Sequence, residues 1–405
     1  MIRWQRWGGR VLVAGLLLGA AATSRGAETI EEAFRTADFI VDWRARYESV
    51  QQDGFSESAE AMTSRLRLGL QTAPLKSTSL LAEAVVTSDL VDDYNSTTNG
   101  QTQYPVVADP TDFVALNRFA IINKSLERTT LTFGRQRIIL DDARFVGNVG
   151  WRQQEQTFDG VRAQMNGSTV KVDVTYAAQV NRIFGPDSPQ GEWKGDVALL
   201  NLSHTFPAGT LSVFDYYLDI DTVAAASSNT IGAKLAGAKP LGGLKGNYAL
   251  AYARQADAGA NPVNVDEDYW LLEGGLSFAK LGVGLGYELL SGNGVTAFQT
   301  PLATLHAFQG WADKFLATPA HGIDDRYVRV SYPFGKHGRF TSIAAVAVFH
   351  DLSADVGGAH YGEELDFQLL ARTERVALTL KYADYRADTL LTDTDKLWLS
   401  IDYAF

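Results

Sequence analysis

Hydrophobic and polar residues alternate with a period of two along most of the chain after residue 38. Between residues 41 and 48 the apolar set is Val41, Trp43, Ala45 and Tyr47, and the polar set is Asp42, Arg44, Arg46 and Glu48. The same alternation recurs at 64–70, 170–176, 364–369 and 396–405. Because successive side chains of a strand point to opposite faces, this pattern predicts β-strands with one apolar and one polar face.

About eighteen segments of this kind follow one another. We expect them to begin near residues 38, 60, 78, 113, 129, 158, 169, 196, 210, 229, 245, 267, 281, 325, 339, 361, 375 and 394. Short connections (73–76, 126–129, 166–168, 207–209, 242–244, 335–338) alternate with long polar ones (91–112, 139–157, 182–195, 256–266, 291–324). This predicts an all-β fold, a transmembrane antiparallel β-barrel of about 18 strands with long extracellular loops, short periplasmic turns and periplasmic termini.

A soluble β-sandwich is the alternative for so many short strands. It would bury its apolar faces and would not require long and short connections to alternate. Aromatic residues near strand ends favour the barrel, because girdles of aromatic rings lie at both membrane interfaces. They are Tyr47, Tyr287, Tyr332, Phe334, Tyr382, Tyr403 and Phe405.

The N-terminal segment predicts export. Arg3, Arg6 and Arg10 precede an apolar stretch at 11–22 and a small-residue stretch at 22–27. Twelve apolar residues are too few for a membrane-spanning helix, so we expect a signal peptide at 1–26 and an outer-membrane β-barrel at 27–405. Residues 28–35 are consistent with one turn of helix.

Composition narrows the function. The chain has no cysteine, so it has neither disulfides nor a cysteine-based metal site. Its net charge of −11 becomes −15 without residues 1–26, which carry four arginines and no acid, so nucleic acid is not expected as a partner. None of the six histidines lies in a GxSxG or HExxH motif. We therefore expect neither an enzyme nor a cofactor; a membrane serine hydrolase, which needs an oriented Ser–His pair, is the weaker alternative.

The most distinctive stretch is 129–165, which predicts a strand, a long loop and a returning strand. Its cationic residues are Arg135, Arg137, Arg144, Arg152 and Arg162, and its rings include Phe145, Trp151 and Phe158. Arginine binds carboxylates through two parallel hydrogen bonds, and aromatic faces stack on sugars or guanidinium groups. Sugar or carboxylate binding is one interpretation, and bracing of the loop is the other.

This stretch resembles the alginate export family of outer-membrane porins. The similar segments are GRQR at 134–137, DD at 141–142, RFVGNVGWRQ at 144–153, QTFDGVR at 156–162 and TPLATLHAFQGWADKFLATP at 300–319, together with the terminal Phe405. The resemblance implies an eighteen-stranded barrel with a lumen lined by arginines and lysines, through which an anionic polyuronate passes outward. The stretch 144–151 is closer to the wider family than to its alginate secretors, so the fold transfers better than the substrate.

The polar faces of the predicted strands give an independent test. Their basic residues are Arg44, Arg46, Arg65, Arg67, Arg118, Arg162, Lys171, Arg329, Arg372 and Lys381, and their acidic residues are Asp42, Glu48, Glu83, Asp173, Glu273, Glu288, Glu364, Asp366 and Asp402. Basic residues lead up to Asp173 and acidic ones afterwards. The hypothesis is a ladder of basic residues on the first seven strands, completed by the 139–157 loop. The alternative is that arginines pair with acids to fill a wide barrel.

The predicted substrate-binding set is therefore Arg44, Arg46, Arg65, Arg67, Arg118, Arg135, Arg137, Arg144, Arg152, Arg162, Lys171 and Trp151. Arg135 and Arg137 are out of phase with the polar face of their strand. Because an arginine on the lipid side at mid-depth costs about 2–4 kcal/mol, we expect them near the rim or turned inward.

Two weaker patterns lie in the loops. Residues 302–316 have near-helical apolar spacing, which predicts a short amphipathic helix packed on the barrel mouth, or a lid with Asp313 and Lys314 facing solvent. Paired acids at 92–93, 141–142, 324–325 and 393–395 lack the calcium-loop pattern, so solvated loop charge is the favoured interpretation.

The expected function is a channel for an anionic solute, most simply an alginate-like polyuronate. A general or small-nutrient uptake porin is the alternative, because a passive pore has no direction of its own. The expected partners are an anionic polysaccharide or small anionic solute, outer-membrane lipid and lipopolysaccharide, and periplasmic secretion proteins. The chain is expected to be a monomer.

Overall fold

The computed structural model describes residues 26–109 and 112–405. The predicted signal peptide therefore lies outside the described residues, apart from Gly26. In chain order the elements are α1 (Ile30–Arg35), β1 (Asp38–Gln52), β2 (Ala59–Gln71), β3 (Thr78–Asp93), β4 (Phe113–Asn123), β5 (Thr129–Gln136), β6 (Thr157–Asn166), β7 (Val170–Asn181), β8 (Glu192–Phe206), β9 (Gly209–Ile220), η1 (Asp221–Ala226), β10 (Ser228–Leu241), β11 (Leu244–Asp257), β12 (Asp266–Phe278), β13 (Leu281–Leu290), η2 (Leu305–Ala307), β14 (Ile323–His337), β15 (Phe340–Ser353), β16 (His360–Arg372), β17 (Val376–Ala387) and β18 (Thr394–Ala404).

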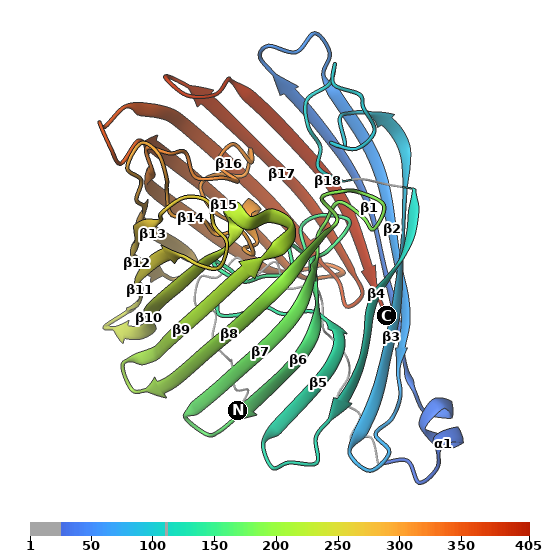
Figure 1. The fold of residues 1–405 in the computed structure, drawn as a ribbon. Helices are drawn as coiled ribbons and strands as arrows, with labels where there is room; N and C mark the ends of the chain where they lie inside the picture. Colours follow the sequence, from blue (N-terminus) through green and yellow to red (C-terminus); the bar gives the residue numbers. More distant parts are fainter. Residues whose placement is uncertain (1–25, 110–111) are drawn as a thin grey trace.

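The eighteen strands form one closed antiparallel barrel (Figure 1). Each strand pairs with the next along the chain, and β1 also pairs with β18. Val41 and Phe405 complete the seam: the Phe405 N–H donates to the Val41 carbonyl at 2.9 Å, and the reverse bond measures 3.4 Å. Closure matters because it leaves no strand edge with unpaired backbone groups inside a bilayer.

The predicted architecture is confirmed in detail. All eighteen predicted strand starts lie within four residues of the observed ones. The largest difference is β8, expected at 196 and beginning at Glu192, because its polar first residues continue the ladder by pairing with the end of β7. The predicted helical turn near 28–35 is α1, in which Thr29 Oγ1 accepts from the Glu32 N–H at 3.1 Å.

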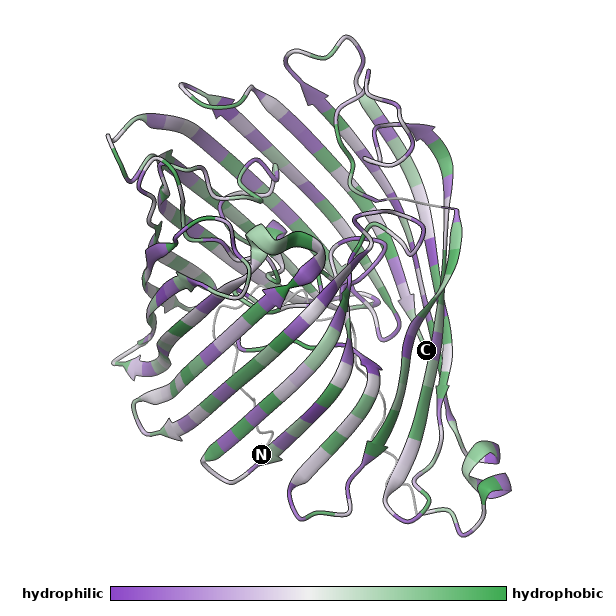
Figure 2. Ribbon diagram, in the orientation of Figure 1, coloured by the Kyte–Doolittle hydropathy of each residue, from purple (hydrophilic) through white to green (hydrophobic). Residues whose placement is uncertain are grey.

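The two faces of each strand meet different environments. Outward apolar side chains stay exposed, for example Val114 at 71% and Leu285 at 63%, whereas inward polar ones such as Arg46, Glu48 and Glu364 are almost fully buried. Figure 2 shows the resulting alternation of hydrophobic and hydrophilic bands along the strands. The apolar face therefore points outward and the polar face lines the lumen. Within the described ranges, no helix has the length and apolarity needed to cross a membrane.

Candidate functional site: the luminal arginines and two inward loops

Two long loops fold into the barrel: the 137–156 loop, between β5 and β6, and the 291–322 loop, between β13 and β14. They pair with each other, since the Gly147 N–H donates to the Leu302 carbonyl at 2.8 Å. Their bonds to the wall join Gln153 to Thr63, Glu155 to Asn117, Asp141 to Asn201 and Ser212, Gln299 to Gln255, Arg144 to Glu288, and Lys314 to Thr394. These partners come from strands around the barrel, so the two loops cross the lumen and narrow it.

Four arginines form a row on the inward faces of β1 and β2: Arg44, Arg46, Arg65 and Arg67. Arg44 and Arg65 are direct cross-strand partners, an arrangement that repulsion between like charges disfavours. Neighbouring carboxylates offset this repulsion. The Arg44 Nε donates to Asp402 Oδ1 at 2.5 Å, and Arg65 pairs with Asp42.

Three members of this arginine row keep donors without an acceptor. In Arg46, Arg65 and Arg67, the Nε and one terminal nitrogen are buried and have no hydrogen-bond partner among the described residues. The carboxylates beside Arg46 and Arg67 are too far away to bond. Asp109 lies 3.6 Å from Arg46 Nη1, and Asp42 and Glu155 lie 3.6 and 3.8 Å from Arg67 Nη1. Since buried donors in proteins are nearly always hydrogen-bonded, these N–H groups can serve the oxygens of an anion or of water.

Trp151 joins the arginine row to both inward loops. The Arg46 guanidinium lies 4.1 Å from the centroid of its ring, and Arg46 Nη2 donates to the Trp151 carbonyl at 2.6 Å. The ring stacks on His306 at a centroid separation of 4.3 Å and meets the edge of Trp398. Trp151 is only 6% exposed. In this conformation Arg46 and His306 lie against the faces of the ring, so a sugar could stack on it only if they moved; a role of Trp151 in substrate binding stays a prediction.

Glu155 anchors the 137–156 loop. Its carboxylate accepts two hydrogen bonds from Arg137, at 2.5 and 2.6 Å, and further bonds from Asn117 at 2.7 Å and Asn148 at 2.6 Å. Burial alone would raise the pKa of Glu155, but Arg137 and Arg67 hold that pKa well below its usual range. The side chain is therefore a buried carboxylate on which several donors of the loop and the wall converge.

Asp313 anchors the 291–322 loop in the way that Glu155 anchors the 137–156 loop. Its carboxylate accepts from Arg152 Nη2 at 2.6 Å, lies 3.6 Å from Lys396 Nζ, and contacts His306 Nδ1 at 2.8 Å. Burial alone would raise the pKa of Asp313, whereas His306, Arg152 and Lys396 hold it below its usual range. His306 Nε2 lies 2.6 Å from Lys381 Nζ. A neutral His306 that donates at Nδ1 and accepts at Nε2 satisfies both neighbours.

Acidic residues of the later strands hold the loop backbone. Glu364 accepts from the Ala312 N–H at 2.7 Å, and Asp366 accepts from the Trp311 N–H at 3.2 Å. On β13, Glu288 accepts from Arg144 Nε at 2.6 Å. The acidic bias predicted after Asp173 is therefore used largely to fasten the two loops.

Several predicted residues are paired, as the alternative interpretation expects. Within each pair, the shortest distance between nitrogen and carboxylate oxygen is 2.6 Å for Arg118 with Glu83, 2.5 Å for Arg137 with Glu155, 2.6 Å for Arg144 with Glu288, 2.6 Å for Arg152 with Asp313, and 2.5 Å for Arg162 with Asp173. Lys171 is exposed near the periplasmic end of β7 and has no ion pair within the described part of the chain. A role in substrate binding stays a prediction for these residues.

Arg135 and the 302–316 segment require corrections. Arg135 lies near the rim, as expected, but on the outward face of β5, where it pairs with Asp159 at 2.7 Å, so it does not line the lumen. The predicted helix at 302–316 is wrong: only Leu305–Ala307 is helical, as a 3₁₀ turn. Leu302, Trp311 and Phe315 are buried inside the barrel, whereas Leu316 is exposed. Asp313 is buried, so the solvent-facing lid is wrong as well.

Sequence reasoning missed Glu155, Asp313 and His306. His306 and Asp313 lie in the 300–319 segment that resembles the family, and Glu155 lies between two such segments, but none of the three shows the spacing of a binding motif. Their importance comes from contacts between residues far apart in the sequence, as in Arg152 with Asp313 and His306 with Lys381. No group of three or more potential metal ligands occurs within residues 26–109 and 112–405.

Acidification is expected to weaken the attachment of the 291–322 loop. Burial holds the pKa of His306 well below its usual range, although Asp313 opposes the shift. Below the unfolded pKa of about 6.5, the unfolded state takes up a proton that the folded state does not. The free energy of unfolding is therefore highest above that pH and falls progressively below it. Tryptic cleavage after Lys314 should therefore accelerate below about pH 6.5. H306N, which stays neutral, should flatten this dependence; an unchanged profile in H306N would contradict the role of His306.

The barrel is similar to solved structures of outer-membrane porins of the Occ/Opd group. The alginate export family model matches residues 35–186 and so confirms the resemblance over that part of the chain. Pseudomonas aeruginosa OccK9 (OpdG) is 16% identical, with a TM-score of 0.72 over 92% of this chain and 100% of that one. Pseudomonas aeruginosa OpdK, solved with vanillate, is 14% identical, with a TM-score of 0.67 over 91% and 98%. Acinetobacter baumannii OccAB4 is 14% identical, with a TM-score of 0.65 over 91% and 98%. No curated protein sequence matches the chain.

Proposed function

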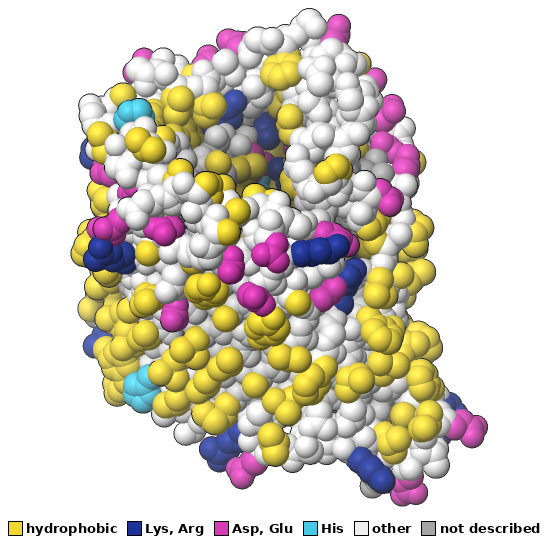
Figure 3. All heavy atoms as spheres, in the orientation of Figure 1, with side chains coloured by type: hydrophobic (Ala, Val, Ile, Leu, Met, Phe, Trp, Pro, Cys, Tyr) yellow, Lys and Arg dark blue, Asp and Glu magenta, His cyan; other side chains and the backbone are white. Residues whose placement is uncertain are grey.

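We propose that this barrel, which has the fold of outer-membrane porins and matches the alginate export family over residues 35–186, is a passive channel for anionic solutes that carry carboxylates. The observation that carries the proposal is the set of unpaired guanidinium donors on Arg46, Arg65 and Arg67. Within low-dielectric walls such donors focus a positive potential on a passing anion. Figure 3 shows a hollow at the end with the long loops, with Lys or Arg side chains visible inside.

The two inward loops favour a small solute over a thick polymer. Because they bond to each other and to strands around the barrel, a long chain could pass only if they moved. The similar barrel of OpdK was solved with vanillate, which is a small carboxylate. A polyuronate is the second candidate, and the match to the alginate export family favours it.

Single-channel recording in a planar bilayer tests the proposal. Uronate monomers and short oligomers should block the current, and block should weaken with salt because screening shortens the reach of the arginines. Neutral oligosaccharides of the same length should not block. Block that strengthens up to polymer length would favour polyuronate passage over a small solute, and equal block by neutral sugars would contradict an anion channel.

The triple substitution R46Q/R65Q/R67Q is expected to reduce the ratio of anion to cation permeability about tenfold, because it removes three neighbouring guanidiniums that each keep two buried donors without an acceptor among the described residues. The control is R254Q, whose parent side chain pairs with Asp266 on the exposed outer face. Circular dichroism should confirm that both variants keep the barrel. Unchanged selectivity in the folded triple variant would contradict a function for the arginine row.

A further inference from the structure

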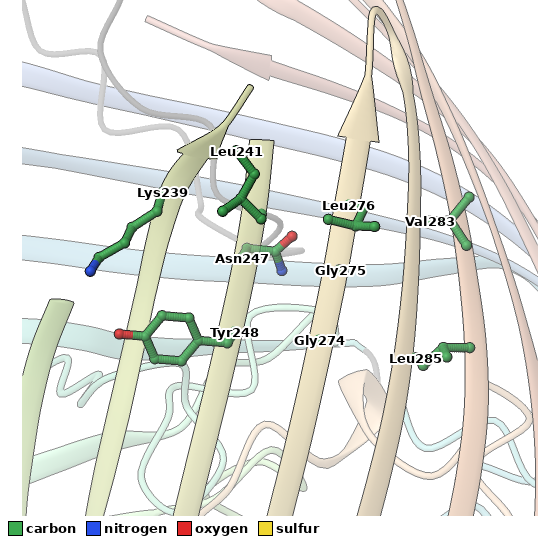
Figure 4. Close-up of a pocket in the computed structure, with 10 residues that line it drawn as sticks. Lys239, Leu241, Asn247, Tyr248, Gly274, Gly275, Leu276, Val283 and Leu285 are labelled. Carbon is green, nitrogen blue, oxygen red and sulfur yellow. The ribbon is translucent and has the colours of Figure 1, made fainter. Parts of the chain in front are cut away.

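The outer wall of the barrel has a groove where β10, β11, β12 and β13 approach their short turns. It has a volume of about 560 Å³, and its apolar lining includes Leu241, Leu276, Val283 and Leu285. These side chains are 42–63% exposed, as expected for the outward face. Figure 4 shows Gly274 on β12 between Tyr248 on one neighbouring strand and Leu285 on the other.

Glycines on the outward face create the groove. Gly274 is the direct cross-strand partner of Tyr248 and of Leu285, and Gly246 is the partner of Lys239 and of Leu276. Directly opposed residues share a face, so both glycines remove side chains from the lipid-facing surface. A Cβ added at Gly274 would meet nothing within 4 Å. The hollow at Gly274 is therefore open space on the outside of the wall.

The rim next to the groove is uniformly cationic. Segments 236–250, 274–286 and 330–344 contain Lys239, Lys245, Lys280, Lys336 and Arg339 and no Asp or Glu. Lys239 itself lines the groove. Elsewhere on the same side of the barrel, the turns at 124–128 and 373–375 mix both signs, with Glu127 and Glu374 beside basic residues. The positive charge is therefore concentrated beside the apolar groove.

We propose that this groove binds an anionic phospholipid of the periplasmic leaflet, with an acyl chain over Gly274, against the Leu241 side chain that covers Gly246, and the phosphate beside Lys239. The apolar lining suits a hydrocarbon chain, and the adjoining basic residues attract an anionic headgroup in a leaflet reached by the short turns. Tyr248 closes one side of the groove, with its hydroxyl donating to the Ala208 carbonyl at 2.7 Å. This lipid site is independent of the solute that the lumen carries.

Native mass spectrometry of the full barrel, extracted from vesicles of equal parts phosphatidylglycerol and phosphatidylcholine, tests the proposal. One phosphatidylglycerol should remain bound in preference to phosphatidylcholine. G274L should lose the retained lipid, because its side chain fills the groove without a backbone clash. K239Q should lower the preference for phosphatidylglycerol about fivefold, the effect of one basic residue near an anionic headgroup.

Two matched controls are available. A84L adds the same side chain to the outward face of β3, beside the exposed Leu68, and K124Q removes a lysine from a turn of mixed charge. Both should retain lipid as the parent protein does. Equal retention in G274L and the parent, or no preference between the two lipids, would overturn the proposal. Because the chain has no cysteine, L276C offers a single thiol; efficient disulfide-linked dimers in native membranes would assign the groove to a second copy and also overturn it.

Discussion

Replacing Asp313 by Asn is expected to release the 291–322 loop from the wall and to increase single-channel conductance. The substitution keeps the size of the side chain but removes the charge that faces Arg152 and Lys396. Removing one partner of a buried ion pair costs about 3–5 kcal/mol, because the remaining charge is left buried and uncompensated. If only about 3 kcal/mol of this falls on the attached state of the loop, the released state gains about 100-fold in population. Larger and noisier currents should follow.

The matched control for D313N is D266N. Asp266 pairs with Arg254 on the exposed outer face, where solvent screens the attraction and the pair contributes little to stability. D266N should keep the conductance of the parent channel. If D313N showed the same conductance and the same tryptic cleavage rate after Lys314 as the parent, the Asp313 contacts would not be what holds this loop.

Replacing Glu155 by Gln is expected to loosen the 137–156 loop and, in contrast to the arginine substitutions, to increase anion selectivity. The neutral amide would leave Arg137 without its carboxylate and would remove one of the two acids near Arg67, the other being Asp42. Because Glu155 is buried, removing its charge is expected to lower the free energy of unfolding by about 3–5 kcal/mol. The net charge beside the arginine row becomes more positive by one. Thermal unfolding and reversal-potential measurements on the same preparation would report the two effects separately.

E192Q is the control for E155Q, since Glu192 forms a partly exposed pair with Lys194 at the long-loop end of β8. It makes the same change of charge without removing a buried partner, so it should change neither the unfolding temperature nor the selectivity appreciably. A fall in anion selectivity in E155Q, despite a folded barrel, would indicate that Glu155 orients the arginines more than it neutralises them.

The local pattern of the chain was sufficient to determine the barrel. Alternation in segments such as 41–48 and 396–405 determines which face of a strand is apolar, and the long and short connections determine on which side of the membrane each turn lies. Backbone hydrogen bonding then requires closure, which β1 and β18 provide. These properties depend on neighbours within a few residues along the chain, so eighteen strand starts could be predicted closely.

The arrangement inside the lumen depended on the tertiary structure. Sequence could place Arg46, Arg65 and Arg67 on a polar face. Only the folded barrel shows that each keeps donors without an acceptor among the described residues, whereas Glu155 takes the Nε and Nη2 donors of Arg137. The partners of these charges lie on other strands and on a second loop, and periodicity carries no information about such distant pairs. The helix predicted at 302–316 failed for the same reason. The barrel buries Leu302, Trp311 and Phe315, and the loop follows the contacts that the wall offers instead of its own local preference.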